Sequence, residues 1–273
     1  MTAAVTAARG YRDYYANAVR IAITEQFQYR VSNYFYMIGL LAEPVIYLVV
    51  WSTIAEQQGG QVGGLTTGDF AAYYIVWTLV RNMNVVNVGG WAYRIREGEL
   101  SPMLLRPIHP FNWDLGYFAG HKLVIIVLWV PIALILSALF KPTFAFDLAD
   151  VVAFAIAIWG AYLVRSFIYV IVGISAFWTV QIWPLVQVVM MFELLFSGRL
   201  VPLSLMPDWA QTLADVLPFK WTFGFPIEAL IGQLSNVDLV IGLAAQAVWI
   251  GVGVVALRIL WPRAVKRYSA VSG

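Results

Sequence analysis

The chain has 273 residues, of which 61% are hydrophobic and only 12% are charged. Soluble domains carry about 25% charged residues, so a soluble protein of this composition would expose apolar surface and aggregate. The mean hydropathy is +0.76, which predicts a protein that crosses a membrane several times. The absence of cysteine excludes disulfides and thiolate metal sites. The net charge of +2 decides nothing as a total, but the distribution of charge along the chain is informative.

The N-terminal segment, residues 10–30, is predicted to be an amphipathic helix. Arg12 and Arg20 lie off its apolar stripe, and this pattern is typical of a helix in the membrane interface. A helix packed on a soluble core is the alternative, but a membrane span follows directly. No short apolar core precedes a small-residue cleavage site, so we expect no cleavable signal peptide. The stripe consists of Tyr11, Tyr14, Tyr15, Ala18, Val19, Ala22 and Ile23.

The first predicted span covers residues 34–54 and contains Glu43 and Pro44 near its middle. Proline lacks a backbone donor, so we expect a kink there. A carboxylate at this depth should face the protein interior or a wet cavity. The second predicted span covers residues 70–88. Its last turns carry four polar residues, Arg81, Asn82, Asn84 and Asn87.

The third predicted span, residues 116–140, begins with Gly116 and Gly120, a spacing that allows close contact with another helix. Residues 148–196 are almost continuously apolar. At 1.5 Å per residue this run is too long for one crossing and suits two. We therefore predict a fourth and a fifth span, with the turn between them near residues 175–183.

A proline-rich segment, residues 197–234, follows the fifth span. It is predicted to form short helices that dip into the membrane or lie on one face of it. The stretch 206–217 is the best candidate for such a helix, because Pro207 and Asp208 suit its first turn. With a last span near residues 237–260, the sequence predicts an all-α, six-span membrane protein. We expect residues 1–273 to form a single transmembrane domain.

Basic residues indicate the orientation in the membrane. Six crossings place both termini on one side, and that side holds twelve lysines and arginines against three on the other. Such a bias places the termini in the cytoplasm. The twelve are Arg9, Arg12, Arg20, Arg30, Arg94, Arg96, Arg106, Lys122, Arg258, Arg263, Lys266 and Arg267, and the three are Lys141, Arg199 and Lys220.

A short charged segment, residues 93–107, separates the second and third spans and is called the elbow below. It contains Arg96-x-Gly98-x-Leu100 followed by Leu104-Leu105-Arg106-Pro107. The outer segment contains Gly198, Pro202, Pro207 and Pro218-Phe219. With the six spans and the interfacial helix, these motifs resemble the type-2 (export-type) ABC transporter permeases. Within that family the elbow is similar to the branch of viologen- and drug-exporter-like permeases.

The resemblance implies a permease subunit of an ATP-driven exporter in a bacterial plasma membrane. It implies a second permease, the same or related, and a separate ATPase subunit that binds ATP and magnesium. This chain would bind no cofactor and no nucleic acid, and the cytoplasmic segment 89–115 would act as the coupling helix. The expected ATPase-coupling residues are Arg94, Arg96, Glu97, Gly98, Glu99, Leu100, Leu104, Leu105 and Arg106.

The chain is not expected to hydrolyse ATP itself. A phosphate-binding loop needs Gly-x-x-x-x-Gly-Lys-Ser/Thr, whose lysine reaches the phosphates. The nearest stretch, residues 59–66, lacks that lysine. His109, Asp114 and His121 lie near a predicted loop but do not have the spacing of a metal site, so no metal is expected.

Polar residues inside the spans are candidates for a translocation path. Arg81, Asn82, Asn84, Asn87 and Glu193 either line such a path or stabilise helix packing. Arg165, in the fourth span, is a possible partner for Glu43 or for Glu193, and the sequence does not choose between them.

The predicted path is mostly apolar and aromatic, so we expect an amphipathic or hydrophobic substrate. The alternative function is an ion-coupled secondary transporter, which needs carboxylates within the membrane and often has internal repeats. Glu43 and Glu193 supply carboxylates, but no repeat is evident. A third alternative is a scaffold that binds a partner without stimulating ATP turnover.

Overall fold

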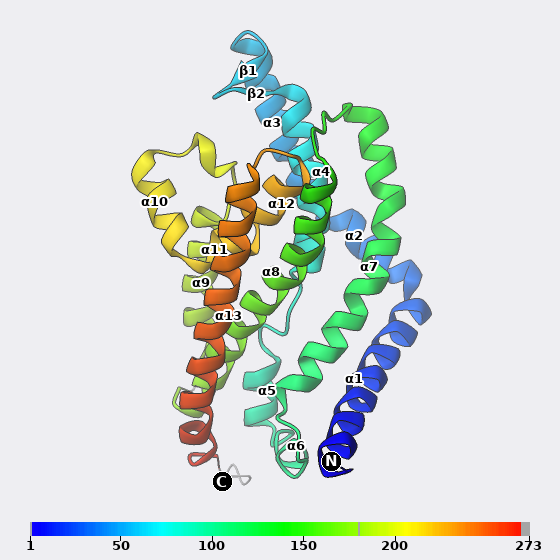
Figure 1. Cartoon of the computed structure of the whole chain (residues 1–273), viewed down its shortest axis with the longest axis vertical. Helices are drawn as coiled ribbons and strands as arrows, with labels where there is room; N and C mark the ends of the chain where they lie inside the picture. The colour runs from blue at the N-terminus through cyan, green and yellow to red at the C-terminus, as the bar shows by residue number, and fades with distance from the viewer. Residues whose placement is uncertain (1, 180, 269–273) are drawn as a thin grey trace.

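The chain is all-α, with 78% of its residues in helices, and the computed structural model describes residues 2–179 and 181–268 (Figure 1). This confirms the predicted all-α class. The helices are α1 (Thr2–Gln28), α2 (Arg30–Leu40), α3 (Ala42–Gln57), α4 (Thr67–Met83), α5 (Gly90–Arg96), α6 (Ser101–Leu104), α7 (Phe111–Phe140), α8 (Leu148–Ile174), α9 (Trp183–Phe196), α10 (Asp208–Val216), α11 (Pro218–Thr222), α12 (Gly224–Leu230) and α13 (Asn236–Val265). Short 3-10 helices, η1 (Ser175–Phe177) and η2 (Leu203–Leu205), and a small hairpin of β1 (Gln61–Val62) and β2 (Leu65–Thr66) complete the described part.

Four helical segments of the described chain are long and apolar enough to cross a membrane. They are Arg30–Gln57, Phe111–Phe140, Leu148–Phe177 and Asn236–Val265. These correspond to the predicted first, third, fourth and sixth spans. The other two predicted spans correspond to α4 and α9, which have only 17 and 14 residues, fewer than the about 20 that a crossing usually needs. The break between α8 and α9 falls at 175–182, within the predicted turn.

Three of the helices begin at a capping box. In each, an N-cap side chain accepts a hydrogen bond from the backbone N–H three residues later, and an aspartate there reaches back to the N-cap N–H. The aspartates also complement the positive end of the helix dipole. These boxes fix where α4, α8 and α13 start. The pairs are Thr66 with Asp69, Asp147 with Asp150, and Ser235 with Asp238.

The first span is broken at Leu41, between α2 and α3, and Pro44 lies in the first turn of α3. Proline has no N–H to donate to the carbonyl of residue 40, so the break comes before the proline and not at it. The predicted kink is therefore confirmed, three residues earlier in the chain.

Helix α4 ends at Met83, so the predicted second span, 70–88, is wrong at its C-terminal end. Asn84 donates a side-chain hydrogen bond to the carbonyl of Thr222 at 2.6 Å, and Asn87 accepts one from the N–H of Gly90. The bond of Asn87 is local and competes with continuation of the helix, whereas Asn84 reaches across to the proline-rich segment. The polar end of the predicted span is thus a loop that joins α4 to α5.

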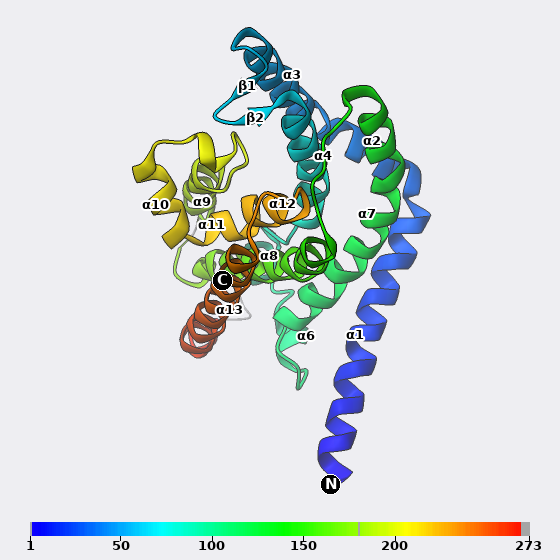
Figure 2. The ribbon, with the colours of Figure 1, turned by 45° about the horizontal axis from the view of Figure 1, so that its top comes forward.

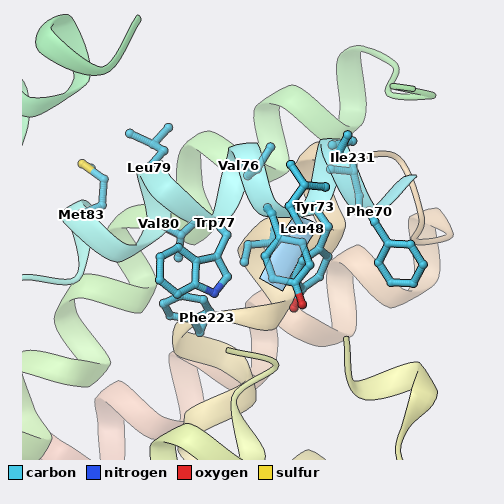
Figure 3. Close-up of a cluster of buried hydrophobic side chains, with 14 of the residues drawn as sticks. Leu48, Phe70, Tyr73, Val76, Trp77, Leu79, Val80, Met83, Phe223 and Ile231 are labelled. Carbon is cyan, nitrogen blue, oxygen red and sulfur yellow. The ribbon is translucent and has the colours of Figure 1, made fainter. Parts of the chain in front are cut away.

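Protein surrounds α4 on nearly all sides. Figure 3 shows its side chains packed in a cluster that includes Leu48 of α3, Phe223 and Ile231. Trp77 meets Phe223 edge to face at 5.3 Å between ring centroids. Tyr73 and Trp77 also donate hydrogen bonds to the carbonyls of Gly198 and Arg199, at 2.6 and 2.9 Å. Helix α4 therefore forms the centre of the fold and holds the start of the proline-rich segment in place.

Helix α1 lies along α7 in both views of the molecule (Figures 1 and 2). Its buried residues Ala18 and Ala22 face the glycines of α7. A Cβ added at Gly120 would lie 2.6 Å from the carbonyl oxygen of Val19, and one at Gly116 would lie 2.8 Å from the Cβ of Ala18. The predicted N-terminal helix and the close contact at these glycines are both confirmed. The prediction that α1 lies in the membrane interface remains a prediction.

The proline-rich segment, 197–234, folds into the short helices α10, α11 and α12. Asp208 opens the first turn of α10, as the sequence predicted, whereas Pro207 is the N-cap and precedes that turn. Helices α11 and α12 pack against α8. The short helices are confirmed, whereas their position relative to the membrane stays a prediction.

Candidate functional site

The elbow, residues 93–107, covers the end of α5 and all of α6, which a turn at Gly98 joins. Gly98 has φ of 77°, a left-handed conformation that side chains disfavour, and it lets the chain reverse between the two helices. Figure 1 shows the elbow at the same end of the molecule as the start of α1 and the end of α13, and this end is called the elbow end below. The charged segment therefore forms two short helices and a turn at this end of the molecule.

One side of the elbow is buried in the protein. Leu100 and Trp91 are almost fully buried, in a cluster with Phe111 of α7, Ile174 of α8 and Leu257 of α13. The hydroxyls of Ser101 and Tyr268 are 2.8 Å apart. The elbow is therefore joined to three long helices by apolar packing, and Leu100 and the partly buried Leu104 face this packing.

Arg94 forms an ion pair within the chain. Its Nη2 lies 2.9 Å from a carboxylate oxygen of Asp114 in the first turn of α7, and only 18% of its side chain is exposed. Asn87 donates a hydrogen bond to the same carboxylate at 3.2 Å. We had expected Arg94 to pair across an interface, but the structure shows it bonded to α7, where it anchors the elbow.

The other side of the elbow faces solvent. Leu105 is 89% exposed, the highest exposure among the large hydrophobic side chains described. Arg96, Glu97 and Glu99 are exposed, and in the described residues none of them makes an ion pair. Arg106 is exposed as well. The exposed side of the elbow, called the tip below, therefore presents one exposed leucine, Leu105, and charges of both signs.

His109 links the elbow to α7. Its Nδ1 accepts a hydrogen bond from the N–H of Phe111 at 3.1 Å, and its ring lies 4.3 Å from that of Trp261. Burial lowers the pKa of His109 to about 4. The imidazole is therefore neutral at pH 7. Across residues 2–179 and 181–268, no three acidic or histidine side chains are placed to hold a metal ion.

The two carboxylates predicted inside the spans, Glu193 and Glu43, are paired with arginines. Arg165 forms an ion pair with Glu193, which also accepts a hydrogen bond from the Tyr169 hydroxyl at 3.2 Å. Arg199 pairs with Glu43 at 2.7 Å. This resolves the choice left open by the sequence, since Arg165 partners Glu193 and not Glu43. The sequence reasoning missed Arg199, although a carboxylate in an apolar helix calls for a nearby cation.

The other predicted path residues do not gather in one cavity. Asn82 donates to the carbonyl of Thr78 at 2.8 Å, one turn earlier in α4. The side chain of Asn84 donates a hydrogen bond to Thr222 of the proline-rich segment, and that of Asn87 donates one to Asp114 of α7. Arg81 is mostly buried, and its Nε has no hydrogen-bond partner in the described residues. Each asparagine therefore has a structural contact, although the Oδ1 atoms of Asn82 and Asn84 are, like Nε of Arg81, buried without a partner in the described residues.

Lys122 is a buried cation that the sequence reasoning did not single out. Its Nζ donates to the carbonyl of Val85 at 2.7 Å and lies 4.0 Å above the ring of Tyr162. These contacts hold the loop after α4 against α7 and α8. Its position in the first turns of a predicted span had suggested only an interfacial charge.

The comparison with known families agrees with this architecture. Residues 41–272 match the model of a family described as ABC-2 family transporter protein. The chain belongs to this family. No curated protein is significantly similar to the permease. Permeases of this family have no ATPase activity of their own and work with ATPase subunits. The protein is thus a multi-pass membrane permease, and the prediction that it does not hydrolyse ATP is confirmed.

Proposed function

We propose that the permease is the membrane subunit of an ATP-driven exporter, in the drug-exporter-like branch, and that a separate ATPase subunit docks on the elbow. The exposed tip carries this proposal. Leu105 stands 89% exposed in a segment with the unpaired charges of Arg96, Glu97 and Glu99. An apolar residue with charges around it suits the centre and rim of a protein interface. ATP and magnesium would be bound by the partner subunit.

The buried side of the elbow supports a role in transmission. Leu100 and Trp91 pack against α7, α8 and α13, and Arg94 bonds Asp114 of α7. A displacement of the tip therefore moves three long helices and does not merely bend a loop. The tip supplies binding, and the packed side and the ion pair pass the motion of the ATPase to the spans.

The proposed topology has six crossings in one domain, with both termini in the cytoplasm of a bacterial plasma membrane. Helix α4 can be short because protein surrounds it. Helix α9 carries exposed apolar side chains, including Trp183, Val188 and Met191, which suit contact with lipid or with a second permease. The segment 197–234 would be a re-entrant hairpin on the outer face.

The proposed substrate is amphipathic or hydrophobic and crosses between two permeases, the same or related. Arg81, Asn82 and Asn84 each have one buried polar atom without a partner in the described chain, and Arg81 is the strongest candidate among them because it also carries a charge. Glu193 is paired with Arg165 and would act on the path only through that pair. The asparagines are proposed to position the loop after α4.

The proposal is tested by replacing Arg96, Glu97 and Glu99 together with glutamines. Tagged permease is extracted from its native membrane in mild detergent, and the ATPase activity that co-elutes per permease is measured. Loss of the rim charges should lower this activity about tenfold. Replacement of the exposed pair Arg12 and Asp13 on α1 is the matched control and should leave it unchanged. Equal activity in wild type, the triple variant and the control variant would contradict docking at the elbow.

The ion-coupled transporter is disfavoured by the same contacts. Such a carrier needs a carboxylate free to bind the ion, and Glu43 and Glu193 are both engaged by arginines. It predicts transport by the isolated chain under an ion gradient without ATP. A scaffold, the third alternative, would bind the ATPase without changing its turnover.

A further inference from the structure

A groove of about 500 Å³ lies at the elbow end, between the start of α7 and the last turns of α13, with α8 behind it. Figure 1 shows α7 and α13 on either side of α8. Its volume is within the range of about 300–1,000 Å³ that is typical of ligand sites. Neither the exposed residues of the elbow tip nor Arg165 and Glu193 line this groove.

The lining of the groove changes along its length. His109, Asn112 and Arg258 line it close to the ends of α7 and α13, beside Trp261. Deeper in the helices the walls are apolar, formed by Leu115, Phe167, Val254 and Leu257. A polar mouth and an apolar floor suit a molecule with a polar head and a hydrocarbon tail. Tryptophan at the mouth is typical of the membrane–water boundary.

Arg258 makes the mouth of the groove positively charged, which favours a negatively charged head group. It is exposed about two turns before the end of α13, and none of the carboxylates in residues 2–179 and 181–268 lies within ion-pair distance of it. An arginine on an apolar helix face needs an anion or water. The mouth therefore attracts an anion.

A second large cavity supplies a contrast. It has about 450 Å³ and is lined by Asp215, Glu228 and Asp238 together with Lys220. Its acidic lining does not suit an anionic head. Of these two cavities, only the groove between α7 and α13 combines an apolar floor with an unpaired cation at its mouth.

From this combination we propose that the groove binds one anionic phospholipid, with its phosphate at Arg258 and an acyl chain along Leu115, Phe167 and Val254. A lipid held there would contact α7, α8 and α13 together, the same helices that pack on the elbow. The site rests on the groove and its charge, and it does not depend on the direction of transport or on the ATPase.

The test measures lipid retained by the whole permease. The protein is reconstituted in vesicles of equal parts phosphatidylcholine and phosphatidylglycerol and extracted again in mild detergent, and bound lipid is counted by mass spectrometry. Wild type should retain phosphatidylglycerol in preference to phosphatidylcholine. Arg258→Gln should lower that preference about fivefold, the effect of losing one basic contact worth about 1 kcal/mol.

Two further variants make the test specific. Arg263→Gln removes the same charge one turn later, where its guanidinium faces the carbonyl of Ile259, and should preserve most of the preference. Val254→Phe fills the apolar floor and should reduce retention of both lipids. Equal losses in Arg258→Gln and Arg263→Gln, no preference in wild type, or undiminished retention in Val254→Phe would each overturn the proposal.

Discussion

At the scale of single residues, the two carboxylates predicted to lie inside the spans, Glu43 and Glu193, each pair with a different arginine. The sequence predicted that Glu43 and Glu193 needed partners and named Arg165 as a possible one. It could not pair them, because pairing depends on how α3, α8 and α9 pack and not on spacing along the chain. It also missed that Arg199 turns inward to Glu43. Residue types could thus be predicted, but their contacts could not.

The pair of Arg165 and Glu193 should be needed for stability. Both side chains are about 95% buried, so Glu193→Gln leaves an uncompensated charge and should cost about 3–5 kcal/mol of unfolding free energy. The double variant Arg165→Met with Glu193→Leu removes both charges and should recover most of that loss. Thermal unfolding in detergent measures both effects. Losses that simply add in the double variant would contradict a coupled pair.

His109 predicts how stability changes with pH. Its pKa is lowered from 6.5 to about 4 by burial, so the folded state stays neutral while the unfolded state takes up a proton. The contribution of His109 is therefore constant above about pH 6.5 and becomes increasingly destabilising as the pH falls towards 4. His109→Gln should lose less stability between pH 7 and pH 5 than wild type does. Identical losses in thermal unfolding would show that His109 does not contribute.

At the scale of elements, apolar runs located the long helices well, although the capping boxes that fix three of their starts were not recognised in the sequence. The sequence failed at the end of α4, where Asn84 and Asn87 bond the backbone of other segments. It also gave the coupling residues a single role, whereas Leu100 faces inward and Leu105 faces outward. The glycines of α7 predicted a close helix contact, but a two-residue pattern contains no information about which helix makes it.

The contact of α1 with α7 gives a prediction at this scale. Gly120→Ala places a methyl group 2.6 Å from the backbone of Val19, which cannot move aside without shifting α1, and should cost about 1–3 kcal/mol. Gly251→Ala in α13 meets nothing within 4 Å and should be neutral or stabilising by up to about 1 kcal/mol. Thermal unfolding and protease cleavage within α1 report the two outcomes. Equal behaviour of both variants would contradict tight packing of α1.

At the scale of the whole molecule, composition and charge distribution predicted a multi-pass membrane protein, and family membership confirms it. Four long apolar helices are found among the described residues, whereas α4 and α9 are too short for crossing to follow from length alone. At one end of the molecule, one side of the elbow packs on three long helices, and its other side is exposed. This division gives the molecule a surface for docking and a route from that surface into the spans.

The most direct test of this account is site-specific cross-linking, because the chain has no native cysteine. Leu105→Cys places one thiol on the elbow tip, and Leu148→Cys places one at the start of α8, at the opposite end (Figure 1). The two leucines are 89% and 80% exposed. Native membranes are treated with a short thiol-to-amine cross-linker, and adducts are assayed for ATP binding. The account predicts an ATP-binding adduct from Leu105→Cys and none from Leu148→Cys. Adducts from Leu148→Cys alone, or in equal yield from both, would contradict it.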